Sequence, residues 1–252
     1  MLAELGPLTK AMIGMVRDGD DHLLAEQICR ACVLALHVDG AAISLLTATE
    51  ARQTLSVTDS TAAKVEDLQF TLGEGACVEA AVSGRPVLVP DLHDHGLTRR
   101  WPVFASAVAE QTDARALFAL PLQLGAINLG VVDLYRTTPG PLRGDELRDV
   151  IAAADTATLL LLEVSAGPPA DGGHSNGQCG QARREDGAWW DGLHSDRAEV
   201  HQATGMILAQ LGVPAQDAFV RLRAYAFAHQ RPVGDVAHDV VARRLVFTED
   251  MT

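Results

Sequence analysis

A stretch rich in glycine and proline divides the chain into two unequal parts. Residues 167–180 contain five glycines and two prolines among small and polar residues. This composition is typical of a flexible connection and supplies no large apolar side chains for a core. We therefore expect two domains within the 252 residues, at 22–164 and 185–247. A linker at 165–184 joins them, and short segments at 1–21 and 248–252 flank them.

The two parts differ in charge. The whole chain has a formal net charge of -13. Residues 197–247 hold six arginines against four carboxylates, a net charge of about +2, so the remainder carries about -15. An acidic surface argues against broad binding of nucleic acids or anionic membranes. The apolar runs are too short to span a bilayer, and the first residues lack a signal-peptide pattern, so we expect a cytoplasmic protein.

The cysteines and histidines predict no metal centre. Cys29 and Cys32 lie three residues apart in a helical pattern, with no second pair at a suitable spacing. We expect both to be buried free thiols in a reducing compartment. The run His93, Asp94, His95 falls in a predicted loop, where such side chains are usually solvated. We therefore expect no metal and no cofactor.

The longer part alternates between helical and strand patterns. Apolar residues recur with helical spacing over 22–37, 76–82, 102–111 and 146–164. Strand patterns cover 41–46, 54–58, 86–91, 116–122 and 126–135, with Gly125 turning between the last two. Strands concentrated in the middle and helices on either side predict an α+β domain with an antiparallel sheet.

Several short motifs occur in this part in a fixed order. They are Gly-Glu-Gly-Ala-Cys at 73–77, Ser-Gly-Arg-Pro-Val at 83–87, Pro90-Asp91, and a hairpin over 120–132. Together they resemble a GAF domain, a sensory module. The resemblance implies a pocket for a small molecule or a protein cue between the sheet and the neighbouring loops. Its candidate lining residues are Gly73, Glu74, Cys77, Asp91, Trp101 and Phe104. Trp101 and Phe104 could instead belong to the core, which is the reading we favour.

The C-terminal part reads as three helices separated by turn residues. Gly212 and Pro214 separate the first two helices, and Pro232 begins the third. Each helix has a single aliphatic stripe, so about 50 residues bury little on their own. We expect the first helix to form a coiled-coil-like stem in a homodimer. The stripe of that stem comprises Trp190, Leu193, Val200, Ala203, Ile207 and Leu211. Gly205 would let the partner's backbone approach closely.

The same part contains three motifs that resemble an ANTAR domain. They lie at 202–208 (Gln-Ala-Thr-Gly-Met-Ile-Leu), at 217–226 and at 235–241. The resemblance implies a three-helix module on a coiled-coil stem that binds RNA stem-loops and prevents transcription termination. The candidate RNA-binding residues are Gln202, Thr204, Arg221, Arg223, Tyr225 and Arg231. Many members carry Lys where this chain has Thr204, although a threonine can still donate to a phosphate.

Other functions fit the sequence less well. Arginines and aromatics suit RNA loops because they contact phosphates and stack on unpaired bases. A helix-turn-helix reading of DNA would need a second helix rich in polar residues, which the sequence lacks. A protein-interaction scaffold without nucleic acid is the other alternative. Cys77 begins a helix, which could activate its thiol, but the loops hold no resolving cysteine. We therefore expect a signal-responsive, non-enzymatic RNA-binding regulator that acts by antitermination.

Overall fold

The structure is a computed structural model that describes residues 6–17, 24–46, 52–125, 127–166, 188–229 and 231–248. The predicted linker after residue 166 and Cys179 lie outside these residues. In chain order, the N-terminal domain comprises α1 (Pro7–Arg17), α2 (Leu24–Ala35), β1 (Gly40–Leu46), β2 (Arg52–Val57), α3 (Ser60–Leu72), α4 (Ala76–Ser83), β3 (Val87–Val89), α5 (His95–Thr98), α6 (Pro102–Gln111), β4 (Ala116–Leu124), β5 (Ile127–Arg136) and α7 (Gly144–Ala166).

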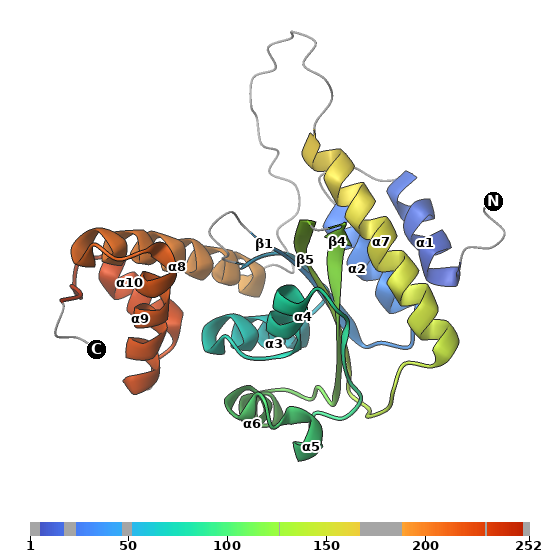
Figure 1. The fold of residues 1–252 in the computed structure, drawn as a ribbon, viewed down its shortest axis with the longest axis horizontal. Helices are drawn as coiled ribbons and strands as arrows, with labels where there is room; N and C mark the ends of the chain where they lie inside the picture. The colour runs from blue at the N-terminus through green and yellow to red at the C-terminus, as the bar shows by residue number, and fades with distance from the viewer. Residues whose placement is uncertain are drawn as a thin grey trace, which may run out of the picture.

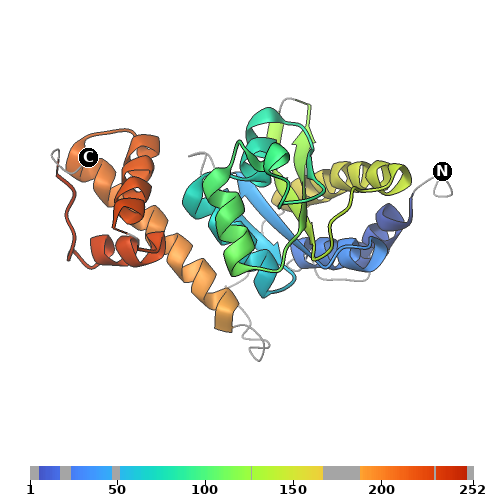
Figure 2. The ribbon, with the colours of Figure 1, turned by 90° about the horizontal axis from the view of Figure 1, so that it is seen from below.

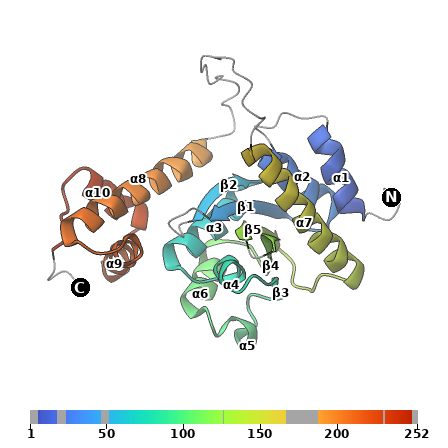
Figure 3. The ribbon, with the colours of Figure 1, turned by 45° about the horizontal axis from the view of Figure 1, so that its top comes forward.

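The N-terminal domain is built on one five-stranded antiparallel sheet, as the sequence predicts. Its strand order is β2-β1-β5-β4-β3. Figure 1 shows β5 between β1 and β4. Helices α1, α2 and α7 cover one face, and α3, α4 and α6 cover the other (Figure 3). The central pair β4 and β5 turns at Gly125, whose φ is 61°. This left-handed conformation favours glycine because a Cβ would be strained there.

Strand alternation distributes the apolar side chains between two cores. In β4, Phe118 and Leu120 face α2 and α7, whereas Leu117 and Ala119 face α3, α4 and α6. Successive residues of a strand point to opposite faces, so one apolar strand serves both cores. Strand β5 follows the same rule, but Asp133 occupies a position on the α3 side.

Helix α3 is missing from the sequence-based prediction. It begins after Asp59, whose carboxylate accepts a hydrogen bond from the Ala62 amide at 2.9 Å, and ends at Gly73 in the left-handed conformation. Both ends follow ordinary capping rules. The polar residues Glu66 and Gln69 are buried along it. They interrupt the apolar stripe that would have revealed the helix.

The N-terminal domain also includes α1, which lies within residues 1–21. The sequence pattern predicts those residues to be a separate segment. Leu8 and Met12 are fully buried in the core with α2 and α7. The Leu8 amide donates to Asp149 of α7 at 2.7 Å. The core therefore extends beyond the predicted boundary at residue 22. The short helix α5 likewise replaces part of a predicted loop.

The C-terminal domain consists of α8 (Ala188–Leu211), α9 (Ala215–Ala228) and α10 (Val233–Val241). Three residues of the predicted stem stripe, Val200, Ala203 and Ile207, are buried in the domain's own core. They pack against α9 and α10, so these positions are already covered without a second copy. On α9, the buried residues are Ala218, Leu222 and Ala226. The side chains of Trp190, Leu193 and Arg197 lie outside the described part.

The two domains meet where α3 contacts α8 and α9 (Figure 2). Phe70 of α3 is 4% exposed and belongs to the apolar core of the C-terminal domain. Within the described residues, no helix has the length and apolar character needed to cross a membrane.

Candidate nucleic-acid interface and sensor interior

Helix α9 presents its predicted RNA-binding residues on different sides. Its inner face packs Ala218, Leu222 and Ala226 into the domain core. Arg221 and Arg223 are two residues apart, which separates them by about 200° around a helix. They therefore lie on opposite flanks of α9, and the structure does not gather them into one patch.

The side chain of Arg223 lies against the C-terminal end of α3. Its Nε donates to the Thr71 carbonyl oxygen at 2.8 Å, and Nη2 donates to the Leu72 carbonyl oxygen. The last carbonyls of a helix have no partner within the helix and carry its negative dipole end. Arg223 thus acts as a cationic cap on a helix of the other domain. A Cβ at the adjacent Gly73 would collide with the guanidinium group.

An aromatic contact reinforces this docking. The Phe70 ring lies 5.4 Å from the Phe219 ring and 6.3 Å from the His201 ring, centroid to centroid. The guanidinium carbon of Arg223 lies 5.5 Å from the Phe219 centroid. The interface therefore combines an apolar anchor with a cation held by backbone carbonyls.

Two other predicted residues are engaged within the C-terminal domain. Tyr225 stacks on His229 at 3.9 Å and meets Phe247 edge-on at 5.4 Å. Arg231 donates to Asp239 at 2.6 Å. Hydrogen bonds from Arg231 and then from another arginine lower the pKa of the Asp239 carboxyl group. In this state the Tyr225 ring and Arg231 Nη2 are both engaged within the C-terminal domain.

The two predicted residues of α8 differ in exposure. Gln202 is exposed, whereas Thr204 is half-buried and its hydroxyl donates to the Val200 carbonyl oxygen at 2.7 Å. That hydroxyl proton is therefore already used, and Thr204 could contact a phosphate only after rotating away. Apart from its chain neighbours and the nearby backbone of α8, no atom of the described residues lies within 4 Å of the point that a Cβ on Gly205 would occupy. Packing within this chain therefore does not explain the glycine.

A groove separates the docked domains beside Arg223. Its volume is about 1020 Å³. Its walls include Glu74 and Val103 from the N-terminal domain and Val220, Phe227 and Arg231 from the C-terminal side. The groove brings one predicted sensor residue, Glu74, close to two predicted RNA-binding residues, Arg223 and Arg231.

The candidate pocket residues of the N-terminal domain lie in different environments. Trp101 and Phe104 are buried and meet edge-on at 6.4 Å between ring centroids. They belong to the core between the sheet and α3, α4 and α6. The sequence left this alternative open. Asp91 lies at the surface and pairs with Arg115 at 3.2 Å. The hydrogen bond from the His93 amide lowers the pKa of Asp91 most strongly.

The Gly-Glu-Gly-Ala-Cys motif serves to position neighbouring groups. Glu74 accepts a hydrogen bond from the Phe104 amide at 3.1 Å, at the start of α6. Gly75 has a φ of 121° and leaves space for the Gln69 side chain, which a Cβ would meet. The Cys77 backbone amide in turn donates to the side-chain oxygen Oε1 of Gln69 at 2.7 Å.

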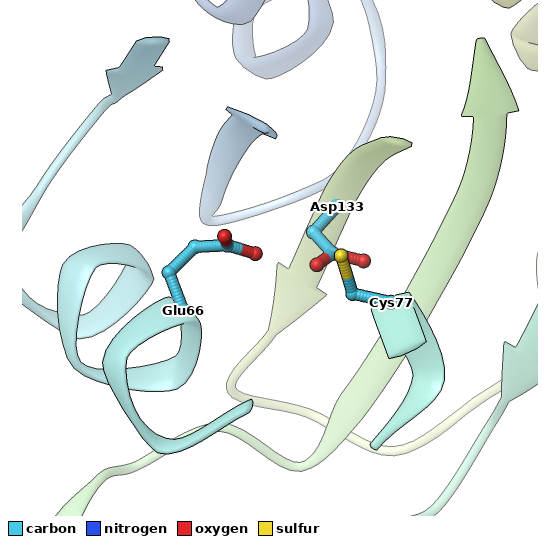
Figure 4. A group of neighbouring side chains, drawn as sticks. All are labelled: Glu66, Cys77 and Asp133. Atoms are coloured by element: carbon cyan, nitrogen blue, oxygen red, sulfur yellow. The ribbon is translucent and has the colours of Figure 1, made fainter. Parts of the chain in front are cut away.

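A buried polar cluster lies beneath this motif and was not predicted from the sequence. Its members, Ser44, Thr54, Glu66, Gln69, Cys77 and Asp133, come from β1, β2, α3, α4 and β5. Figure 4 shows the two carboxyl groups and the Cys77 thiol directed toward one another. Burial, followed by repulsion from Glu66, raises the pKa of Asp133 well above its usual range. The signal in the sequence that could have revealed this cluster is the presence of polar residues within otherwise apolar strands.

The remaining described cysteines fit the sequence prediction. Cys29 and Cys32 are buried free thiols on α2. Burial raises the pKa of Cys32 to about 12 and raises that of Cys29 as well. Such thiols are poor nucleophiles at neutral pH because almost none of the thiolate form is present.

Comparisons with known proteins agree with the two resemblances. A GAF domain model matches residues 20–161, and an ANTAR domain model matches residues 194–241. No curated protein sequence matches the chain. The GAF domain of a phosphoenolpyruvate-protein phosphotransferase from Acinetobacter is similar in structure, with a TM-score of 0.50, 12% identity, and coverage of 66% of this chain and 96% of that one.

Two further solved GAF domains show a similar extent of overlap. The one from a Coxiella burnetii phosphoenolpyruvate-protein phosphotransferase has a TM-score of 0.49, 11% identity, and coverage of 64% and 95%. That of the cyanobacteriochrome TePixJ has a TM-score of 0.48, 17% identity, and coverage of 58% and 92%. At such identities, these likenesses concern the fold alone. The GAF model covers more than half of the sequence, and the chain therefore belongs to the GAF domain family and carries an ANTAR domain, the RNA-binding antitermination module, at its C-terminal end.

Proposed function

We propose that this chain is a non-catalytic, signal-responsive regulator that binds RNA stem-loops and favours antitermination, and that its GAF domain restrains the ANTAR domain through α3. The observation that carries the proposal is the docking of Arg223 on the Thr71 and Leu72 carbonyls. This contact joins a predicted RNA-binding residue directly to the sensor domain.

The docking competes with RNA for the same side chain. Arginine reads RNA by pairing with phosphates or stacking on bases, and both modes need a free guanidinium group. In the described state the guanidinium of Arg223 is occupied by α3, and that of Arg231 by Asp239. A cue that moves α3 would release Arg223, whereas Arg231 could exchange Asp239 for a phosphate within its own domain.

The strength of the contact suits a switch. A hydrogen bond involving a charged group contributes about 1.5–3 kcal/mol, and less where water competes for it. Reversing a two-state population from 1:99 to 99:1 takes about 5.5 kcal/mol. The free energy contributed by two such bonds and by burial of the Phe70 ring is of this order. A ligand or partner protein of the GAF domain could therefore open the contact.

Dimerisation belongs to the same proposal. The inner face of α8 is used within the chain, but Gly205 and Leu208 lie on its outer part, and Leu208 is 38% exposed. We assign this outer face to a second copy, which would raise avidity for paired hairpins. A protein that binds nascent transcripts must be where transcription takes place, so the proposal includes a cytoplasmic location.

The test measures binding of the full-length chain to a two-hairpin RNA, a single-hairpin RNA and duplex DNA at several salt concentrations. We expect the two-hairpin RNA to bind most tightly, with an affinity that falls as salt rises. Arg221→Ala should weaken RNA binding, because Arg221 is a predicted RNA-binding residue and lies outside the α3 contact. Arg30→Ala is the matched control, since Arg30 is an exposed arginine on α2 paired with Glu26.

Each alternative has its own outcome in this assay. Preferential binding to duplex DNA would support a DNA-binding regulator. Equal effects of the Arg221 and Arg30 substitutions would show non-specific electrostatic attraction. No binding to any of the three ligands, also in a variant with the α3 contact opened, would leave a protein-interaction scaffold.

A further inference from the structure

The centre of the GAF domain contains three acidic side chains close enough to share one ion. One carboxylate oxygen from each of Glu66 and Asp133 and the sulfur of Cys77 lie within 4.8 Å of one another. Their residues are 2%, 4% and 0% exposed, respectively. Figure 4 shows that α3, α4 and β5 direct these groups toward a common point. Nothing in the proposed RNA-binding function uses them.

An unpartnered atom points to a missing ligand at this place. Asp133 Oδ2 accepts a hydrogen bond from the Gln69 amide nitrogen at 2.8 Å. Asp133 Oδ1 is buried and has no hydrogen-bond partner. A buried carboxylate oxygen without a donor is costly, and such atoms usually have a partner such as a proton donor, a water or an ion.

Neutral donors hold the two carboxyl groups in place. Ser44 and Thr54 donate to Glu66 Oε2, the latter at 3.3 Å, and Gln69 reaches Glu66 Oε1 at 3.4 Å. Hydrogen bonds of this kind orient metal ligands and are a regular part of metal sites.

We propose that Glu66, Cys77 and Asp133 form a binding site for one divalent transition-metal ion of the Fe²⁺ or Zn²⁺ class. A thiolate ligand disfavours Mg²⁺ and Ca²⁺, and two carboxylates disfavour Cu⁺. Binding would release the thiol proton and any carboxyl proton to solvent. Three protein ligands leave at least one coordination position for water or another small ligand.

The geometry requires only a small contraction. With metal–ligand distances of about 2.0–2.3 Å, the ligand atoms of a tetrahedral site lie about 3.3–3.8 Å apart. The ligand atoms are at present up to 4.8 Å apart. Side-chain rotations that move these atoms by roughly 1 Å would bring them into that range. A divalent charge would also offset the mutual repulsion of the acidic groups.

The site lies on the helix that contacts the ANTAR domain. Glu66 precedes Phe70 by four residues, about one turn of α3. Metal occupancy would therefore be sensed at the domain junction. This last step rests on the proposed function, whereas metal binding itself does not.

The experiment uses full-length protein prepared with chelator and then refolded or incubated anaerobically with Co²⁺, a spectroscopic substitute for both ions. We expect about one Co²⁺ per chain by elemental analysis, together with a thiolate-to-cobalt charge-transfer band. Asp133→Asn should lower the affinity at least tenfold. Gln69→Met, which removes an orienting hydrogen bond, should lower it about 10–100-fold.

Thiol controls make the test specific. Cys77→Ser should abolish the band, whereas Cys32→Ser should retain it, because Cys32 is buried on α2 away from the cluster. Circular dichroism of each apo-protein checks folding, and Asp133→Asn carries the test if Cys77→Ser fails to fold. Two results would overturn the proposal: wild-type protein that binds cobalt no more strongly than Asp133→Asn, or a charge-transfer band that survives in Cys77→Ser. Glu66 and Asp133 would then be a carboxyl pair that shares a proton. RNA affinity is measured separately with and without Co²⁺, so its failure to respond refutes only the coupling step.

Discussion

Removing the Phe70 ring should open the contact between the domains and increase RNA affinity. The ring is 4% exposed, and it lies against Phe219 and His201 of the C-terminal domain. In Phe70→Ala, each domain keeps its own core, because the side chain that is lost packs mainly across the junction. The hydrogen bonds from Arg223 to α3 would then lack their apolar support.

The magnitude follows from the contacts that the substitution removes. Burial of a phenylalanine side chain contributes about 1.5–3 kcal/mol. The ring contacts with Phe219 and His201 add about 0.5–1.5 kcal/mol for a favourable pair. A loss of about 2–4 kcal/mol shifts the docking equilibrium by roughly 30- to 1000-fold, at about 1.4 kcal/mol per factor of ten. If docking excludes RNA, affinity should rise at least tenfold, up to the intrinsic affinity of the open state.

Fluorescence anisotropy with a labelled two-hairpin RNA measures this affinity. Val82→Ala is the control, because Val82 is an apolar residue of the same domain that is 87% exposed. Adding Arg223→Ala to Phe70→Ala should then lower affinity, since the released arginine would contact RNA. An unchanged or weaker affinity in a folded Phe70→Ala protein would refute the idea that α3 restrains RNA binding.

Three further predictions concern stability and reactivity. Gly205→Ala should weaken self-association in sedimentation experiments, because we assign the outer face of α8 to a second copy. A gain of about 1 kcal/mol in the free energy of unfolding with unchanged self-association would contradict that assignment. The Arg143 amide, followed by Arg136, lowers the pKa of Glu146, so this carboxylate stabilises the fold above its unfolded-state pKa and ceases to do so as pH falls through its folded-state value. The urea midpoint of Glu146→Gln should therefore fall less on acidification from neutral pH than that of the wild type. Cys32 should resist a disulfide reagent until the protein unfolds, which stopped-flow absorbance can follow beside a Cys32→Ser control.

Local sequence patterns were sufficient to predict much of the architecture. The alternation in β4 and β5 is visible in the sequence because each strand residue faces one of two apolar cores. Turns at Gly125 and Gly212 were predictable because both adopt positive φ, which glycine tolerates best. Helix α3 escaped notice because Glu66 and Gln69 are buried where a periodic pattern requires apolar residues.

The candidate RNA-binding surface was only partly accessible from the sequence. Arg223 was recognised as a candidate, but its partners Thr71 and Leu72 lie more than 150 residues earlier in the chain. Helical periodicity places Arg223 at the edge of the apolar stripe and says nothing about what covers that edge. Phe70 had no predicted role for the same reason, since its partners belong to another domain.

By itself, the sequence determined the division into an acidic sensor part and a basic helical part, the strand alternation, and the turns at Gly125 and Gly212, because each depends on neighbouring residues. Only the tertiary structure decided that Arg223 caps α3 and that Glu66, Cys77 and Asp133 converge. Those arrangements depend on which distant segments pack together. A side chain's chemistry can be read from one position, but its partners are chosen by the folding of the whole chain.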